Sequence, residues 1–120
     1  MNESRPTITA EFVEGPQGPE GFKHEGVEFF RIRLGVSDLP DSTYAVTYTL
    51  HDTFFDPVRE AREKTGFMEE IETYGDFTVY AKVRTRQGVV SLKRQLSEAL
   101  AEKLPADSRY MTALTELQKN

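Results

Sequence analysis

The chain has 120 residues, enough for one domain with a buried core, and its 38% hydrophobic and 29% charged residues are ordinary for a folded globule. It contains no cysteine, which excludes disulfides and thiolate metal sites, and it shows neither a membrane-spanning apolar run nor a secretory signal, so we expect a cytoplasmic protein. The net charge of −5 argues against nucleic-acid binding, because affinity for nucleic acids comes largely from basic side chains.

Polar and apolar residues alternate in three segments of the first half of the chain. Residues 6–14, 27–36 and 44–51 each follow a period of two, which is typical of a half-buried strand. The segments between them, 15–21 and 37–42, are rich in glycine, proline and other turn residues and predict loops. The pattern assigns four side chains of the third segment to one face: Tyr44, Val46, Tyr48 and Leu50.

The middle of the chain contains one charged segment and two further alternating ones. Residues 57–65 have no apolar stripe and predict a solvated loop or a single helical turn. Residues 67–72 and 77–83 predict two strands joined by a tight turn at 73–76. The pair Gln87-Gly88 is a hairpin signal.

The pattern changes to a helical one near the C-terminus. From residue 91 to 104 apolar residues recur at spacings of three and four, which predicts an amphipathic helix that Pro105 ends. Asp107 or Ser108 can cap a second short helix. Its predicted apolar side consists of Tyr110, Met111, Leu114 and Leu117.

About six to eight short strands, with turn signals about every ten residues, precede this helical segment. The sequence therefore predicts an all-β fold, an immunoglobulin-like antiparallel β-sandwich with a C-terminal helical segment. The Cys…Trp…Cys pattern of antibody domains is absent, so the prediction concerns the architecture alone. We assign the sandwich and its terminal helix to residues 1–104 and a short helical tail to residues 105–120.

The residue pattern gives little support for catalysis or for a metal. His51, Asp52 and Thr53 are consecutive on a segment expected to be extended, where side chains alternate in direction and cannot form a nucleophile–base–acid relay. The two histidines, His24 and His51, and the scattered carboxylates show no ligand spacing. We therefore predict a protein that is not an enzyme and that uses no cofactor.

Two aromatic loops leave the same set of predicted strands. They have the sequences LHDTF, residues 50–54, and TYGDF, residues 73–77. In a packing interpretation, Phe54 and Phe77 belong to the core and Tyr74 is a turn aromatic. Residue types alone favour this interpretation, because aromatic side chains at strand ends usually pack.

A binding interpretation uses the same loops. Phe54 and Tyr74 would flank a shallow slot that His51 and Thr53 line. A flat amide group could stack between the aromatic faces and hydrogen-bond to Thr53 and to the backbone of Tyr74 or Gly75. The two interpretations differ in whether the slot is open.

The sequence VTYTLHDTFFDPVR followed by GFMEEIETYGDFTVYAKV resembles the YEATS domain family. The shared pattern is a strand running into Leu-His-x-Ser/Thr-Phe, and later a strand followed by an aromatic-small-x-Phe turn. The upstream segment GFKHEGVEFFRIRL is similar to the family's first loop, and the resemblance spans residues 20–100.

This resemblance implies an immunoglobulin-like sandwich and, as in eukaryotic members, a reader of acylated lysine with preferences from acetyl to crotonyl. Carried over to this chain, the resemblance makes Phe54 and Tyr74 the two rings of the aromatic sandwich. It implies that Thr53 hydrogen-bonds to the acyl amide. It places His51 at the far end of the pocket, directs the Tyr74 amide N–H to the acyl oxygen, and makes Phe22 an outer aromatic wall. Acylation removes the lysine charge, which suits an aromatic channel.

The loops LHDTF and TYGDF look closer to the prokaryotic branch, which is found mainly beside or fused to signalling and membrane-associated modules. Two hypotheses follow: a module that binds an acylated-lysine peptide, or a structural module that docks a partner protein and binds no acyl-lysine. The helical tail distinguishes the two hypotheses in part, through the leucine stripe formed by Leu96, Leu100 and Leu104. If this stripe is exposed beside Tyr110 and Leu114, it is an interface, and if it packs on the sandwich, it is core.

Overall fold

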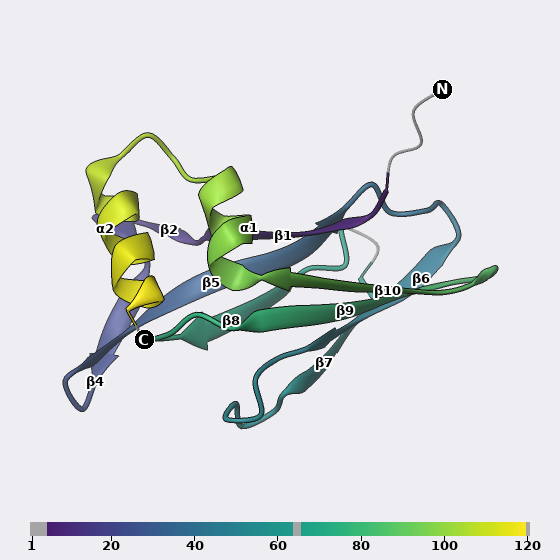
Figure 1. The fold of residues 1–120 in the computed structure, drawn as a ribbon, viewed down its shortest axis with the longest axis horizontal. Helices are drawn as coiled ribbons and strands as arrows, with labels where there is room; N and C mark the ends of the chain where they lie inside the picture. Colours follow the sequence, from purple (N-terminus) through teal and green to yellow (C-terminus); the bar gives the residue numbers. More distant parts are fainter. Residues whose placement is uncertain (1–4, 64–65, 120) are drawn as a thin grey trace.

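A computed structural model describes residues 5–63 and 66–119 of the chain. Two four-stranded antiparallel sheets form a sandwich, with two helices at one end of it (Figure 1). The predicted immunoglobulin-like β-sandwich with a C-terminal helical segment is confirmed. In chain order the elements are β1 (Thr7–Phe12), β2 (Glu14–Gly15), β3 (Gly18–Pro19), β4 (Gly21–His24), β5 (Val27–Ser37), β6 (Thr43–Thr49), β7 (Val58–Ala61), β8 (Glu69–Thr73), β9 (Thr78–Thr85), β10 (Gly88–Gln95), α1 (Leu96–Glu102) and α2 (Ser108–Gln118).

The long strand β5 organises the first sheet. It pairs with β1, β4 and β8, and Phe30 of β5 lies opposite Gly21 of β4 and Thr73 of β8. Side chains on its inner face are buried, as the period of two predicts: Phe30, Ile32, Leu34 and Val36. The register between β5 and β8 places the turn after Thr73 beside the β4–β5 hairpin.

The second sheet has the strand order β10-β9-β6-β7. Here the predicted solvated loop at residues 57–65 is wrong, because Val58–Ala61 forms strand β7 along the edge of β6. Backbone pairing with β6 determines this structure, and charged side chains suit an edge strand, which is why the segment lacks an apolar stripe. The last two residues of the predicted loop, 64–65, lie outside the described residues.

Tyr44 does not share the buried face that the pattern assigned to it. The register between β6 and β9 shifts between Thr43 and Ala45, and this irregularity turns Tyr44 outward, where it is 47% exposed. Val46 and Tyr48, beyond the shift, are fully buried as predicted.

Two other boundaries differ from the prediction. Residues 91–95 are strand rather than helix, since the ladder between β10 and β9 continues to the pair Gln95 and Thr78. The predicted loop at 15–21 overlaps the short hairpin formed by β2 and β3, which begins at Glu14. In both places backbone pairing across a hairpin overrides the local side-chain pattern.

The C-terminal helices complete the core. Leu96 and Leu100 of α1 are buried, α1 packs against β1, and the ring of Phe12 contacts that of Tyr110 in α2 edge-on at 6.1 Å. The leucine stripe is therefore core. Met111 is the exception to the predicted apolar side of α2, because its side chain is exposed.

The helical tail thus packs on the same core, and the division between residues 1–104 and 105–120 stays a prediction. No helix in the described part of the chain is long and apolar enough to cross a membrane.

A buried hydrogen bond joins the two sheets. The hydroxyl of Tyr48, at the end of β6, donates to the backbone carbonyl of Phe67, just before β8, at 2.6 Å. Both residues are buried, and burial raises the pKa of Tyr48 far above its ordinary value, so its hydroxyl keeps the proton that it donates.

We expect Tyr48→Phe to lower the free energy of unfolding by about 1–3 kcal/mol, because it leaves the buried Phe67 carbonyl without its donor. Chemical denaturation measures this change. Tyr80→Phe is the matched control: Tyr80 is 50% exposed, and we expect a change within about 0.5 kcal/mol. Equal effects of the two substitutions would contradict the assigned role of Tyr48.

Candidate functional site

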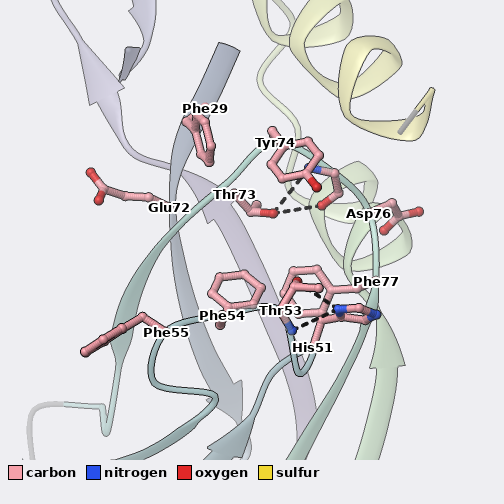
Figure 2. A pocket seen from close by; sticks show the side chains of 11 residues that line it. Phe29, His51, Thr53, Phe54, Phe55, Glu72, Thr73, Tyr74, Asp76 and Phe77 are labelled. Carbon is pink, nitrogen blue, oxygen red and sulfur yellow. Dashed lines mark hydrogen bonds between the residues drawn. The ribbon is translucent and has the colours of Figure 1, made fainter. Parts of the chain in front are cut away.

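The two aromatic loops meet at one end of the sandwich and enclose an open cavity of about 320 Å³ (Figure 2). The first loop connects β6 to β7, and the second is the turn between β8 and β9. The residues that line the cavity are Phe29, His51, Thr53, Phe54, Phe55, Glu72, Thr73, Tyr74, Gly75, Asp76 and Phe77.

The first loop is a compact turn rather than the extended segment expected from the sequence. The Phe54 N–H donates to the His51 carbonyl at 3.1 Å, and the backbone N–H of Thr53 donates to the Nδ1 atom of His51 at 3.3 Å. The Thr53 hydroxyl lies 2.8 Å from the same Nδ1. In the tautomer that carries its proton on Nε2, Nδ1 accepts from both groups of Thr53, and the lone pairs of the Thr53 hydroxyl remain to accept another hydrogen bond.

This geometry does not form a catalytic relay. The Asp52 carboxylate approaches Nδ1 of His51 at 3.2 Å, the same nitrogen that faces Thr53. A relay uses both ring nitrogens, one for the nucleophile and one for the acid. The structure thus brings the side chains of His51 and Thr53 into direct contact at the cavity, in an arrangement that orients the Thr53 hydroxyl without forming a relay.

The second loop is held by its own side chains and by α1. The buried Thr73 accepts from the Gly75 N–H at 3.3 Å and donates to the Gly75 carbonyl at 3.0 Å. Asp76 accepts from the Ser97 N–H at 2.9 Å, and the neighbouring Phe77 carbonyl accepts from the Leu96 N–H at 2.9 Å. The turn is therefore fastened to the first turn of α1, and the Gly75 N–H is already engaged within the loop.

Aromatic rings form the walls of the cavity. Phe54 is half-buried and its ring lies 5.2 Å from that of Phe77, whereas Tyr74 is 46% exposed on the opposite side of the opening (Figure 2). The Phe29 ring contacts Tyr74 edge-on at 5.3 Å, and Phe22 stacks on the other side of Phe29 at 5.2 Å.

Five of the residues proposed from the sequence thus line one cavity: His51, Thr53, Phe54, Tyr74 and Gly75. Phe22 lies one ring further out, and Phe29 occupies the wall next to Tyr74. Sequence reasoning missed Phe29, although its place on the outer face of β5, directly opposite Phe22 in β4, could have indicated it. The ligand-binding roles of all six residues stay predictions.

Residues suited to a metal are not gathered at this site. Within the described part of the chain, no group of three or more His, Asp or Glu side chains is placed to hold a metal ion.

The family follows from comparison with known proteins. A family model of the prokaryotic YEATS domain matches residues 30–97, which is more than half of the 120 residues. The chain belongs to the prokaryotic YEATS family. The match includes both cavity loops and Phe30, but ends just inside α1.

Solved YEATS domains share the fold of this prokaryotic YEATS domain. The structure of the yeast AF-9 homolog Yaf9 has 21% sequence identity and a TM-score of 0.54, covering 77% of this chain and 66% of that chain. A Yaf9 YEATS domain recognizing an H3K122suc peptide has 19% identity and a TM-score of 0.57, with 92% and 91% coverage. A Yaf9 YEATS domain bound to H3K27ac has 24% identity and a TM-score of 0.52, with 77% and 70% coverage. Comparison with curated proteins gave no match.

Asp76 offers a test of how α1 supports this site. We expect Asp76→Ala to lower the free energy of unfolding by about 1 kcal/mol, because the Ser97 N–H at the start of α1 loses its acceptor. Asp76→Asn retains an amide oxygen for this N–H, so most of the stability should remain. Thermal or chemical unfolding of both variants checks the prediction, and equal losses would show that the hydrogen bond is not the cause.

Proposed function

We propose that this domain is a non-catalytic binding module whose cavity takes an acylated lysine on a peptide or partner protein. The observation that carries the proposal is the meeting of Phe54 and Tyr74, on facing walls of one cavity, with a Thr53 hydroxyl oriented by His51. Phe54 and Tyr74 supply two aromatic surfaces for a planar group, and Thr53 supplies an acceptor for an amide N–H.

The chemistry of an acylated lysine suits this arrangement. Acylation replaces the ammonium charge by a planar amide with an apolar tip, which can stack on aromatic faces at little desolvation cost. In the Nε2–H tautomer of His51 the hydroxyl proton of Thr53 is directed to the ring, so the lone pairs of Thr53 would accept from the N–H of this amide. A cavity of about 320 Å³ is at the lower end of the range for small-ligand pockets, which fits one side chain and its acyl group.

The charge of the domain supports a basic peptide around the modified lysine. The whole chain carries a net charge of −5, the cavity wall includes Glu72 and Asp76, and no Lys or Arg is among the described residues that line the cavity. Complementary charge of this kind accelerates association and favours basic partners.

Two further observations agree with the proposal. Recognition of H3K122suc and binding of H3K27ac are stated for Yaf9 YEATS domains, which share the fold of this chain. The alternative of a docking module without acyl-lysine binding depended in part on an exposed leucine stripe, whereas Leu96 and Leu100 are buried.

We expect calorimetric titration with a short basic peptide to show binding when its lysine is acetylated or crotonylated, and none when it is unmodified. Tyr74→Ala should weaken binding at least about tenfold, because it removes one aromatic wall. Tyr44→Ala is the matched control: its ring is equally exposed, at 47% against 46%, and lies at the opposite end of β6. Absence of binding at millimolar peptide, with folded protein, would overturn the proposed function.

Thr53 is tested by a pair of substitutions that separate its hydroxyl from its shape. We expect Thr53→Val to weaken binding of the acetylated peptide about two- to tenfold, since it keeps the volume and removes the hydrogen bond. Thr53→Ser, which keeps the hydroxyl, should bind within about twofold of the wild type. A Val variant that binds like the wild type would exclude Thr53 as the amide acceptor.

A further inference from the structure

Strand β10 lies at the edge of the second sheet, and one of its two sides has no neighbouring strand. Among the described residues it pairs with β9 alone. Leu96, directly after β10, donates its N–H to the Phe77 carbonyl at 2.9 Å, so hydrogen-bonded pairs recur at every second residue before it. The backbone N–H and C=O groups of Val89, Ser91 and Lys93 therefore point away from β9.

The unpaired side of β10 is accessible. No described residue hydrogen-bonds to the backbone groups on this side, Val89 is 52% exposed, and Ser91 and Lys93 are exposed as well. The hairpin of β9 and β10 extends to the end of the molecule opposite the two helices (Figure 1). The free edge ends where Arg94 donates to the Ile8 carbonyl of β1 at 2.9 Å. An unpaired strand edge is a template on which a further strand can form.

The outer face of the second sheet is basic, although the whole chain carries a net charge of −5. The alternation of buried and exposed residues along β9 places Lys82 and Arg84 on this face, and Lys93 of β10 lies on it too. Lys82 and Lys93 are exposed and form no ion pair with any described residue. Glu60 of the edge strand β7 approaches Arg84 at 4.0 Å and offsets part of its charge. The free edge of β10 thus borders a positively charged surface.

The two faces beside this edge suit different side chains. A strand added to β10 would direct alternate side chains to the outer and the inner face of the sheet. On the outer face they would lie beside Lys93, where carboxylates are favoured. On the inner face they would lie beside Val90, which is 37% exposed and pairs with the buried Val83, so apolar side chains are favoured there. A second copy of this chain fits less well, because pairing two β10 strands would join two basic faces in one sheet.

We propose that the free edge of β10 binds an extended segment of a partner protein in which acidic and apolar residues alternate, and that this segment adds to the second sheet as a further strand. Backbone hydrogen bonds to Val89, Ser91 and Lys93 hold the segment, and the basic face selects its carboxylates. The edge shares no residue with the cavity lining, so this inference goes beyond the proposed function and does not depend on it.

Amide hydrogen exchange, measured by NMR, tests the strand addition directly. The probe is a capped peptide of alternating valine and glutamate residues, compared with a valine–lysine peptide of the same length. With the glutamate peptide, the N–H groups of Val89, Ser91 and Lys93 should exchange at least about tenfold more slowly, because each gains an acceptor. The N–H groups of Val90 and Leu92, which already bond to β9, should change little.

Substitutions of Ser91 separate its backbone N–H from its side chain. Ser91→Pro removes an N–H that is not part of the ladder with β9, and proline is tolerated at such edge positions. The variant should therefore fold, as thermal unfolding can verify, while its affinity for the glutamate peptide falls at least about tenfold. Ser91→Ala keeps the N–H and should bind within about twofold of the wild type.

The contribution of charge is tested at Lys93. We expect Lys93→Glu to weaken binding of the glutamate peptide at least about threefold, because like charges on neighbouring strands repel. Lys23→Glu makes the same change on the exposed strand β4 of the other sheet and should keep the wild-type affinity. Tyr74→Ala leaves β10 intact and should bind the glutamate peptide like the wild type, whatever the acyl-lysine titration shows.

Three results would overturn the inference. The first is equal binding of the glutamate and lysine peptides, or no exchange protection at millimolar glutamate peptide. The second is wild-type affinity in Ser91→Pro. The third is a dimer of the domain alone, seen by analytical ultracentrifugation and abolished by Ser91→Pro, which would assign the edge to a second copy of the chain.

Discussion

A buried hydrogen bond between Tyr48 and the Phe67 carbonyl ties together the two sheets from which the halves of the site extend. Tyr48 is fully buried near the end of β6, two residues before the first cavity loop, and Phe67 lies where the chain has crossed to the other sheet and enters β8. From these two points the chain runs directly into the loop that carries Phe54 and into the turn that carries Tyr74. The aromatic walls follow strands of different sheets, so their separation depends on how the two sheets pack, and this hydrogen bond adds a directional contact to the shared hydrophobic core.

Ion pairs lie on the outer face of the first sheet. Arg31 of β5 pairs with Glu20 and with Glu72 on β8, at 2.5 and 2.9 Å. Such exposed pairs stabilise the fold only slightly, but cross-strand pairs of opposite charge favour the register in which they form. Here they have a second effect, because Arg31 offsets the charge of Glu72 at the cavity wall.

The sequence predicts those parts of the fold in which side-chain burial alone determines the pattern. Phe30 and Ile32 of β5 alternate with charged residues, and their burial follows directly from the period of two. The pattern does not predict strand β7, because an edge strand is defined by backbone pairing with its neighbour and tolerates charged side chains. The pattern does not predict the exposure of Tyr44 for a related reason, since a single irregularity in the β6–β9 ladder reverses which side chains face the core.

The same distinction applies to the cavity. The aromatic and hydroxyl residues of the loops can be recognised from the sequence, since two short motifs place Phe54 and Tyr74 at strand ends. The hydrogen bond between His51 and Thr53 depends on a turn that no pattern of residue types indicates. Phe29 belongs to the site only because β8 pairs with β5 in one register, which places the turn after Thr73 beside its ring.

The helical segment is part of the site's architecture, although it contributes no residue to the cavity lining. The first turn of α1 has no side-chain cap of its own, and its Ser97 N–H is satisfied by Asp76 from the loop between β8 and β9. The adjacent Leu96 N–H donates to the Phe77 carbonyl, while the Leu96 side chain is buried in the core. Such anchorage keeps a loop in one conformation before a ligand binds. A mobile loop binds a ligand more weakly, because ordering the loop costs conformational entropy. The leucines of α1 therefore support the cavity indirectly: by packing into the sandwich they hold in place the backbone N–H groups of Leu96 and Ser97, to which the turn that carries Tyr74 is attached.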